Sequence, residues 1–177
     1  MWNSEFKLAI YSDNPDYRVD LNELETLLKK LALIGAPLSK NRYTTGDNFL
    51  SLLTFLGCSP NIELEPLDDQ PYCYIEIESH AKPQFISGKN TKYPPCPYCK
   101  STLENTQCEN CNETIKEADL AKLNWRKSAF IASSWITIGN IYELEAIPND
   151  QLLNALHMQA GTQWKAAYIR CVDGCNG

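Results

Sequence analysis

The chain has 177 residues, of which 44% are hydrophobic and 21% are charged, and its formal net charge is −6. This ordinary globular composition suffices for one core and a small appendage. No apolar run approaches the length of about 18 residues that a transmembrane helix needs, so no membrane association is expected. The N-terminus has no apolar signal sequence, and we expect it to be unprocessed.

The eight cysteines bear on the cellular compartment. In a secreted protein of this size they could form a disulfide framework. Four of the eight have metal-ligand spacing instead, and no signal sequence precedes them. The sequence therefore predicts a reducing, cytoplasmic location.

Charge is distributed unevenly along the chain. Residues 1–81 hold 6 Lys/Arg against 13 Asp/Glu, whereas residues 82–127 hold 8 against 5 and residues 128–177 hold 2 against 4. An acidic body with a mildly basic middle segment suits a partner of mixed charge. It disfavours general nucleic-acid binding, which requires clustered Lys and Arg for phosphate contacts.

The first elements are a strand and a helix. Residues 5–11 alternate between apolar and polar side chains, which predicts a half-buried strand. Asp20 then caps a leucine-striped helix and forms a capping box with Glu23. Gly35 and Pro37 are expected to end this helix.

The next predicted elements are a loop, a second helix and a strand. The polar segment 38–48 is expected to be a loop, and residues 47–56 are apolar nearly all round, as in a buried helix. Residues 62–71 are acidic and proline-rich, which indicates a loop or short edge strand. Residues 72–79 alternate clearly and predict a strand, and residues 84–87 could form another.

The last third of the chain is again predicted to contain helices and strands. Residues 113–125 predict a short helix, and residues 128–134 and 136–146 predict strands, the second interrupted at Gly139-Asn140. A helix capped by Asn149 and a final strand over 164–172 complete the chain.

The predicted order is β-α-α-β, insert, β-α-β. This order fits an α+β fold, a two-layer ferredoxin-like sandwich with helices on one face of an antiparallel sheet. We expect residues 1–90 and 117–177 to form a discontinuous core domain, and residues 91–116 to form an insert between its second and third core strands.

The strongest chemical signal is CPYCKSTLENTQCENC, residues 96–111. Its two C-x2-C pairs place Cys96, Cys99, Cys108 and Cys111 at the spacing of a tetrahedral zinc site. Four thiolates leave no open position for water or substrate, so a bound zinc ion would be structural. Iron in an FeS4 site uses the same ligands and is the alternative.

The two pairs, CPYCK and CENCN, resemble the knuckles of the zinc ribbon superfamily over residues 96–111 alone. Ribbons often have glycine after each knuckle, whereas Lys100 and Asn112 stand here. Asn tolerates a left-handed backbone, but Lys does so less readily. The resemblance implies a small metal-stabilised hairpin and no single activity, because ribbons serve in nucleic-acid binding, protein docking and stabilisation.

The segment around the cysteines predicts a partner surface. Its candidate residues are Lys92, Tyr98, Lys100, Trp125 and Arg126. Lysines can contact phosphates and aromatic rings can stack on bases, but interspersed carboxylates dilute the positive charge. A protein partner is therefore favoured over nucleic acid.

Several other residues could carry chemistry. Cys58 lies beyond a predicted helix C-terminus, where the dipole does not activate a thiol, and Cys73 and Cys171 alternate with core residues. Cys171 and Cys175 form a C-x3-C pair, which is not the usual redox spacing, and we expect core and tail positions. His80 and His157 have no partner set for catalysis. The carboxylates Glu63, Glu65, Asp68 and Asp69 match no calcium loop and are expected to be solvated.

These patterns favour a non-enzymatic, zinc-stabilised protein-interaction or adaptor module. A nucleic-acid accessory protein that uses the ribbon surface is one alternative. An enzyme with an unrecognised site in the α+β core is another, and Cys58 and His80 would then be the first residues to test. No pattern indicates an oligomeric state.

Overall fold

The main feature of the fold is a six-stranded antiparallel sheet. The computed structural model describes residues 6–57, 62–66 and 71–171. The strands are β1 (Phe6–Ser12), β2 (Ile34–Ser39), β3 (Arg42–Thr45), β4 (Leu53–Phe55), β5 (Tyr74–Ile86), β6 (Phe130–Gly139), β7 (Ala146–Pro148) and β8 (Trp164–Arg170). The large sheet has the order β2-β3-β5-β6-β1-β8, and β4 pairs with β7 in a second, two-stranded sheet.

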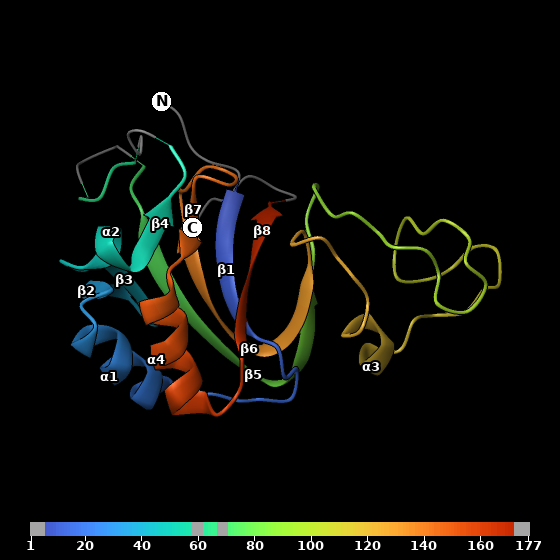
Figure 1. The fold of residues 1–177 in the computed structure, drawn as a ribbon, viewed down its shortest axis with the longest axis horizontal. Coiled ribbons are helices and arrows are strands. Elements are labelled where there is room, and N and C mark those ends of the chain that lie inside the picture. Colours follow the sequence, from blue (N-terminus) through green and yellow to red (C-terminus); the bar gives the residue numbers. More distant parts are fainter. Residues whose placement is uncertain (1–5, 58–61, 67–70, 172–177) are drawn as a thin grey trace.

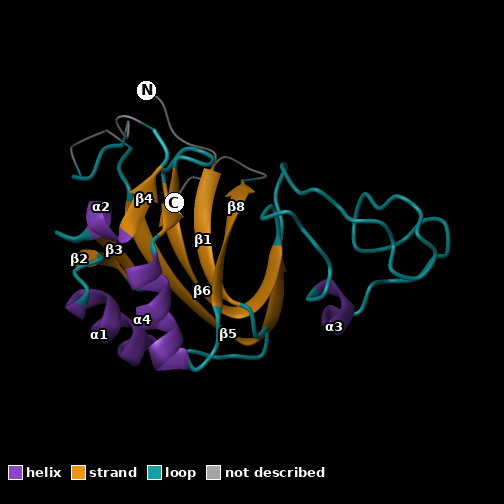
Figure 2. Cartoon of the chain, viewed as in Figure 1, coloured by secondary structure: helices purple, strands orange, loops and turns teal. Residues whose placement is uncertain are grey.

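Two helices cover one face of the large sheet (Figures 1 and 2). The described helices are α1 (Leu21–Lys30), α2 (Phe49–Leu52), α3 (Glu117–Leu120) and α4 (Asp150–Ala160). Leu24 and Leu28 of α1 and Leu152 and Leu156 of α4 are fully buried in the main core, against sheet residues such as Ile136. None of these described helices is long and apolar enough to cross a membrane.

The N-terminal caps of the two long helices confirm the sequence prediction. The predicted end of the first helix is wrong, because α1 ends at Lys30 and both Gly35 and Pro37 lie in β2. The Asp20 carboxylate accepts hydrogen bonds from the N–H groups of Asn22 and Glu23, at 2.8 and 3.1 Å. The Asn149 side chain accepts from the N–H of Leu152 at 2.9 Å. Gly161 ends α4 with a left-handed φ of 66°, a conformation that glycine adopts without strain.

The predicted helix over residues 47–56 is wrong for its second half. Only α2 is helical, and at Leu53 the backbone becomes extended, with φ −114° and ψ 140°. Leu53 pairs with Pro148 in the β4-β7 sheet and is buried there. Pairing with a distant strand therefore outweighs the local helical pattern.

The predicted loop over residues 38–48 contains most of a β-hairpin. β2 runs through Gly35 and Pro37, and β3 pairs with both β2 and β5. The turn between them uses Asn41, whose φ is 62°. The Arg42 guanidinium binds the Glu76 carboxylate at 2.7 Å and so fixes the hairpin to β5.

The long strands β5 and β6 replace four shorter predicted strands. They pair from Tyr74 to Ile86, with one register shift between Ser79 and Gln84. Such a bulge increases the local bend, and both strands curve strongly in Figure 1. Residues 87–129, hereafter the insert, connect β5 to β6 and extend to one side of the sheet (Figure 1).

The beginning of the insert is bound along the outer side of β8. The Asn90 amide donates to the Tyr168 carbonyl and accepts from the Arg170 N–H, each at 2.8 Å. The N–H of Tyr168 donates to the Lys127 carbonyl at 2.9 Å. A Cβ at Gly88 would collide with the Arg170 carbonyl, so only glycine permits this close approach. Both ends of the insert are therefore held against the sheet.

Candidate metal centre

Each cysteine pair folds into the same tight turn. The N–H of Cys96 donates to the carbonyl of Ser101 at 2.8 Å, and the N–H of Cys108 donates to the carbonyl of Glu113 at 2.9 Å. An antiparallel bridge between Gln107 and Thr114 closes the second turn. The segment thus contains two matched knuckles whose cysteines face one another.

The residue after each knuckle has a left-handed backbone. φ is 65° at Lys100 and 57° at Asn112. These are the two positions at which ribbons often have glycine. The backbone geometry that the resemblance implies is therefore present, although Lys100 adopts it at a steric cost that glycine would avoid.

The four cysteine sulfurs lie close enough to share one metal ion. All four Sγ atoms are within 4.8 Å of one another. Cys96 and Cys111 are separated by 3.9 Å, and Cys99 and Cys108 by 3.5 Å. A tetrahedral zinc ion with Zn–S bonds of about 2.3 Å requires S···S separations of about 3.8 Å. The donor set therefore fits a tetrahedral thiolate-preferring ion, such as zinc or iron.

Ser101 is a previously unpredicted part of this centre. Its hydroxyl lies 3.0 Å from Cys99 Sγ and 3.1 Å from Cys108 Sγ. Hydrogen bonds from its hydroxyl and backbone, with one from the Asn110 side chain, lower the pKa of Cys99 to about 5. The same hydroxyl is the main cause of a lowered pKa at Cys108. Ser101 therefore favours the thiolate form that a metal ion binds.

Cys111 shows why four adjacent thiolates need a cation. The N–H of Glu113 lowers its pKa, but burial and the neighbouring thiols of Cys108, Cys99 and Cys96 outweigh this effect and raise the pKa to about 12. Without a metal ion, Cys111 therefore keeps its proton at neutral pH. A bound dication would remove this repulsion and release that proton.

The centre is continuous with a hydrophobic cluster. Cys96 and Cys108 are fully buried beside Trp125, and the same cluster includes Ile131 of β6 and the half-buried Phe85 of β5. The remaining buried members are Leu103, Ile115, Leu120 and Ala129. The metal ligands thus belong to the packing that joins the insert to the sheet.

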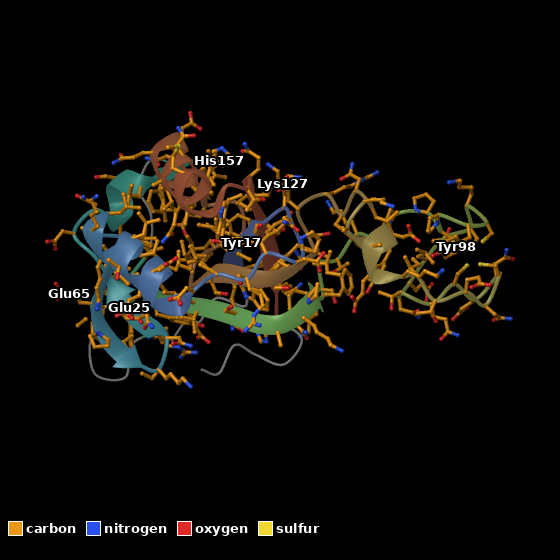
Figure 3. All side chains as sticks on the ribbon, turned by 90° about the horizontal axis from the view of Figure 1, so that it is seen from below. Tyr17, Glu25, Glu65, Tyr98, Lys127 and His157 are labelled. Atoms are coloured by element: carbon orange, nitrogen blue, oxygen red, sulfur yellow. The ribbon has the colours of Figure 1, made fainter. Side chains whose placement is uncertain are left out.

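The predicted surface residues fall into two groups. Lys92, Lys100 and Arg126 are exposed, and Tyr98 is 44% exposed on the outer part of the insert (Figure 3). The Tyr98 hydroxyl donates to Asp119 at 2.9 Å, which ties the first knuckle to α3.

Trp125 differs from this prediction, because only 6% of it is exposed. Its ring packs against Phe85 and Tyr93, with centroids 4.9 and 5.6 Å away, and its indole N–H donates to the Leu120 carbonyl at 2.8 Å. Trp125 therefore supports the insert from inside and does not form the exposed aromatic surface that the sequence predicted.

The histidines are both engaged in local contacts. His80 Nε2 lies 2.9 Å from the Glu78 carboxylate, and its ring stacks on Trp135 at 4.9 Å. His157 Nδ1 lies 3.0 Å from the Thr162 carbonyl. Neither histidine belongs to the group of potential metal ligands, which consists of the four cysteines alone among the described residues.

The other two described cysteines, Cys73 and Cys171, do not join the cluster. Cys73 is buried, and its thiol donates to the Asn140 carbonyl at 3.2 Å. Burial, with smaller contributions from Glu145 and Glu63, raises the pKa of Cys73 to about 12. Cys171 is half-buried and disulfide-bonded rather than a core thiol, a state that a reducing compartment disfavours.

Some predicted residues lie outside the described part of the chain, namely Cys58, Asp68, Asp69 and Cys175. Glu63 and Glu65 are described. Among described side chains, the cysteine cluster is the one group of three or more potential ligands, so these two carboxylates form no such site.

Comparison of the chain with protein-family models, curated proteins and solved structures found no match. The likeness to a zinc ribbon therefore rests on the two knuckles.

Proposed function

We propose that this protein is a non-enzymatic binding module in which a structural metal ion, most simply zinc, stabilises the insert. The observation that carries this proposal is the closed set of four cysteine sulfurs within 4.8 Å of one another. With every tetrahedral position occupied by protein, the ion has no open site for a substrate.

The location of the cluster supports a structural role. A segment as small as the two knuckles, residues 96–111, buries too little apolar surface to order itself, and metal binding can supply the missing folding free energy. Here Cys96 and Cys108 belong to the same buried cluster as Trp125. Metal binding would therefore order both the knuckles and the surface around them.

The proposed fold class is a ferredoxin-like sandwich with additions. The elements β1-α1-β5-β6-α4-β8 occur in β-α-β-β-α-β order, and their strands are arranged as β5-β6-β1-β8. This order fits the split β-α-β pattern, in which another strand lies between the two strands that each helix connects. Here β6 lies between β1 and β5, and β1 lies between β6 and β8. The β2-β3 hairpin would then be an extension beside β5.

The partner that we propose is a protein that contacts the exposed side of the insert. Lys92, Lys100 and Tyr98 remain exposed there, and the surrounding segment is the one net-positive part of an acidic chain. A rigid surface of mixed charge suits electrostatic complementarity with a protein partner.

The test compares capture by the metal-loaded protein with capture by Cys99→Ser. Glu109→Gln is the control, because it changes an exposed side chain between the second pair of cysteines and removes no ligand. The expected result is a protein partner that wild type and Glu109→Gln retain and Cys99→Ser loses. Absence of metal in the native protein, or equal capture by all three, would overturn the proposal.

A further inference from the structure

A cleft of about 330 Å³ lies where the insert meets the main sheet. One wall comes from the turn after α3, including Trp125, Arg126 and Lys127. Tyr11 at the end of β1 and Lys165 of β8 also line the cleft. Figure 3 shows Lys127 at this junction, well apart from Tyr98. A second hollow of about 380 Å³ shares Tyr11, Lys127 and Lys165 with the cleft, so the two are adjacent.

The cleft is basic although the whole chain is acidic. Its lining contains Lys122, Arg126, Lys127 and Lys165 against one carboxylate, Asp13. Lys165 lies 3.5 Å from Asp13, and Lys122 lies 3.6 Å from Asp119 outside the cleft. Within the described residues, Arg126 and Lys127 form no ion pair. Two cations are therefore held beside a recess without a neutralising side chain.

These two cations occupy a strained turn. φ is 52° at Arg126 and 58° at Lys127, and the N–H of Ser128 donates to the Trp125 carbonyl at 3.0 Å. A four-residue turn with two successive positive φ values is normally made by Asn-Gly or by similar residues. Placing Arg-Lys here costs stability on account of their β-carbons.

The surrounding structure maintains this unfavourable turn. The Ser128 hydroxyl donates to the Trp125 carbonyl at 2.6 Å, and the Lys127 carbonyl accepts from Tyr168 in β8 at 2.9 Å. The Arg126 N–H donates to the Asn124 side chain at 3.0 Å. Strained residues that are held so firmly cluster at binding sites, where their side chains need a fixed position.

The cleft also has an aromatic side. The Tyr11 ring stacks on Phe130 with centroids 4.4 Å apart and interplanar angle 13°. Phe130 is buried, while Tyr11 remains half-buried and lines both hollows. A planar apolar group could therefore contact Tyr11 while an attached anion reaches Arg126 and Lys127.

We propose that this cleft binds a small phosphate ester that carries a planar group, as a mononucleotide does. The guanidinium fork of Arg126 matches two phosphate oxygens, and Lys127 supplies a second charge. A recess of about 330 Å³ is of ligand size. A long nucleic-acid strand fits less well, because it would leave the cleft over a body in which residues 1–81 hold 13 Asp/Glu against 6 Lys/Arg. The proposal concerns residues other than the metal ligands and requires no protein partner.

The test is calorimetric titration of the metal-loaded full chain with adenosine diphosphate, inorganic pyrophosphate and citrate. The first two should bind, and citrate, which has comparable charge but no phosphate, should bind at least about tenfold more weakly. The double variant Arg126→Asn/Lys127→Gly should lose at least about tenfold in affinity for adenosine diphosphate, since it removes both charge-assisted contacts.

The same double variant should melt at a higher temperature than wild type, because Asn-Gly relieves the turn. Loss of binding in a more stable protein distinguishes a ligand site from a structural defect. The charge-matched control is Lys82→Gln/Lys116→Gln, which changes two exposed lysines outside the cleft lining and should bind as wild type does.

Three results would overturn the proposal. These are no phosphate binding at millimolar concentration, wild-type affinity in the double variant, and equal binding of citrate. A fourth would be a single-stranded oligonucleotide whose affinity exceeds that of the mononucleotide and rises steeply with strand length, since this would indicate a strand-binding groove. Metal content is measured after each titration, so that a failure to bind phosphate can be distinguished from loss of the metal ion.

Discussion

The backbone at Lys100 provides a quantitative test of the knuckle geometry. Lys100 follows the first cysteine pair with φ 65°, and a residue with a β-carbon loses about 1–2 kcal/mol in this region. Lys100→Gly removes that cost but gives the unfolded chain more freedom, worth about 0.5–1 kcal/mol in the opposite direction. The net expectation is stabilisation of the folded knuckle by about 0.5–1 kcal/mol.

This stabilisation should appear as tighter metal binding, because the knuckle must fold in order to bind. A gain of about 0.5–1 kcal/mol corresponds to about a two- to fivefold higher zinc affinity. Competition with a chromophoric chelator at fixed pH measures the affinity directly. The side chain itself contributes little, since its ammonium makes one exposed contact, with the Pro97 carbonyl at 3.3 Å.

Two controls separate backbone strain from charge. Lys100→Ala removes the ammonium but keeps a β-carbon, so its zinc affinity should stay close to that of wild type. Ala121→Gly places glycine where φ is −63°, and it should weaken the insert instead. If Lys100→Gly bound zinc more weakly than Lys100→Ala, the reasoning about a strained left-handed position would be refuted.

Three further predictions follow from individual side chains. The native protein should contain one zinc per chain by mass spectrometry, and Cys99→Ser should lose about a hundredfold in affinity; a red, iron-containing protein would instead establish the FeS4 alternative. At pH 8 the buried thiol of Cys73 should react with alkylating reagents far more slowly in native than in denatured protein, because a pKa raised from 9.0 to about 12 lowers its thiolate fraction about a thousandfold; equal labelling of the Cys73 peptide in both states would contradict this. Tyr168→Phe should lower the free energy of unfolding in urea by about 1–3 kcal/mol, since the Tyr168 hydroxyl bonds both the N–H and the carbonyl of buried Ala146. Burial also raises the pKa of Tyr168 from 10.0 to about 12. The folded state therefore retains its proton where the unfolded state loses it, and wild-type stability should fall between pH 10 and about 12 more steeply than that of Tyr168→Phe.

Local chemistry made some features predictable. The caps at Asp20 and Asn149 depend on a side chain and backbone groups within three residues, so the sequence shows them directly. The cysteine cluster was equally predictable, because two C-x2-C pairs encode their own turn and each requires a ligand partner.

Features that depend on distant pairing were not predictable. Leu53 is extended because it meets Pro148, which lies far along the chain. The hairpin around Asn41 is stabilised by Arg42 binding Glu76 in β5. No window of sequence around these residues contains the partner that decides their conformation.

The predicted surface failed at Trp125 for a related reason. A tryptophan in a polar, lysine-rich segment suggests an exposed aromatic contact. In the structure it fills the space between Phe85 and Tyr93 instead. The role of Ser101 could not be predicted, because a serine two residues after a cysteine is not a distinctive pattern. Its hydroxyl also contacts the sulfur of Cys108, and this contact depends on the fold of the segment.

The contacts of Asn90 have a consequence for self-association. An outer strand with free N–H and carbonyl groups can pair with the same strand of another molecule and begin aggregation. Asn90 and Lys127 satisfy those groups on β8 at Tyr168 and Arg170. If loss of metal unfolds the insert, this protection is removed while the rest of the sheet survives. Metal depletion should then produce concentration-dependent oligomers, so that the cysteine cluster helps to keep the protein colloidally stable.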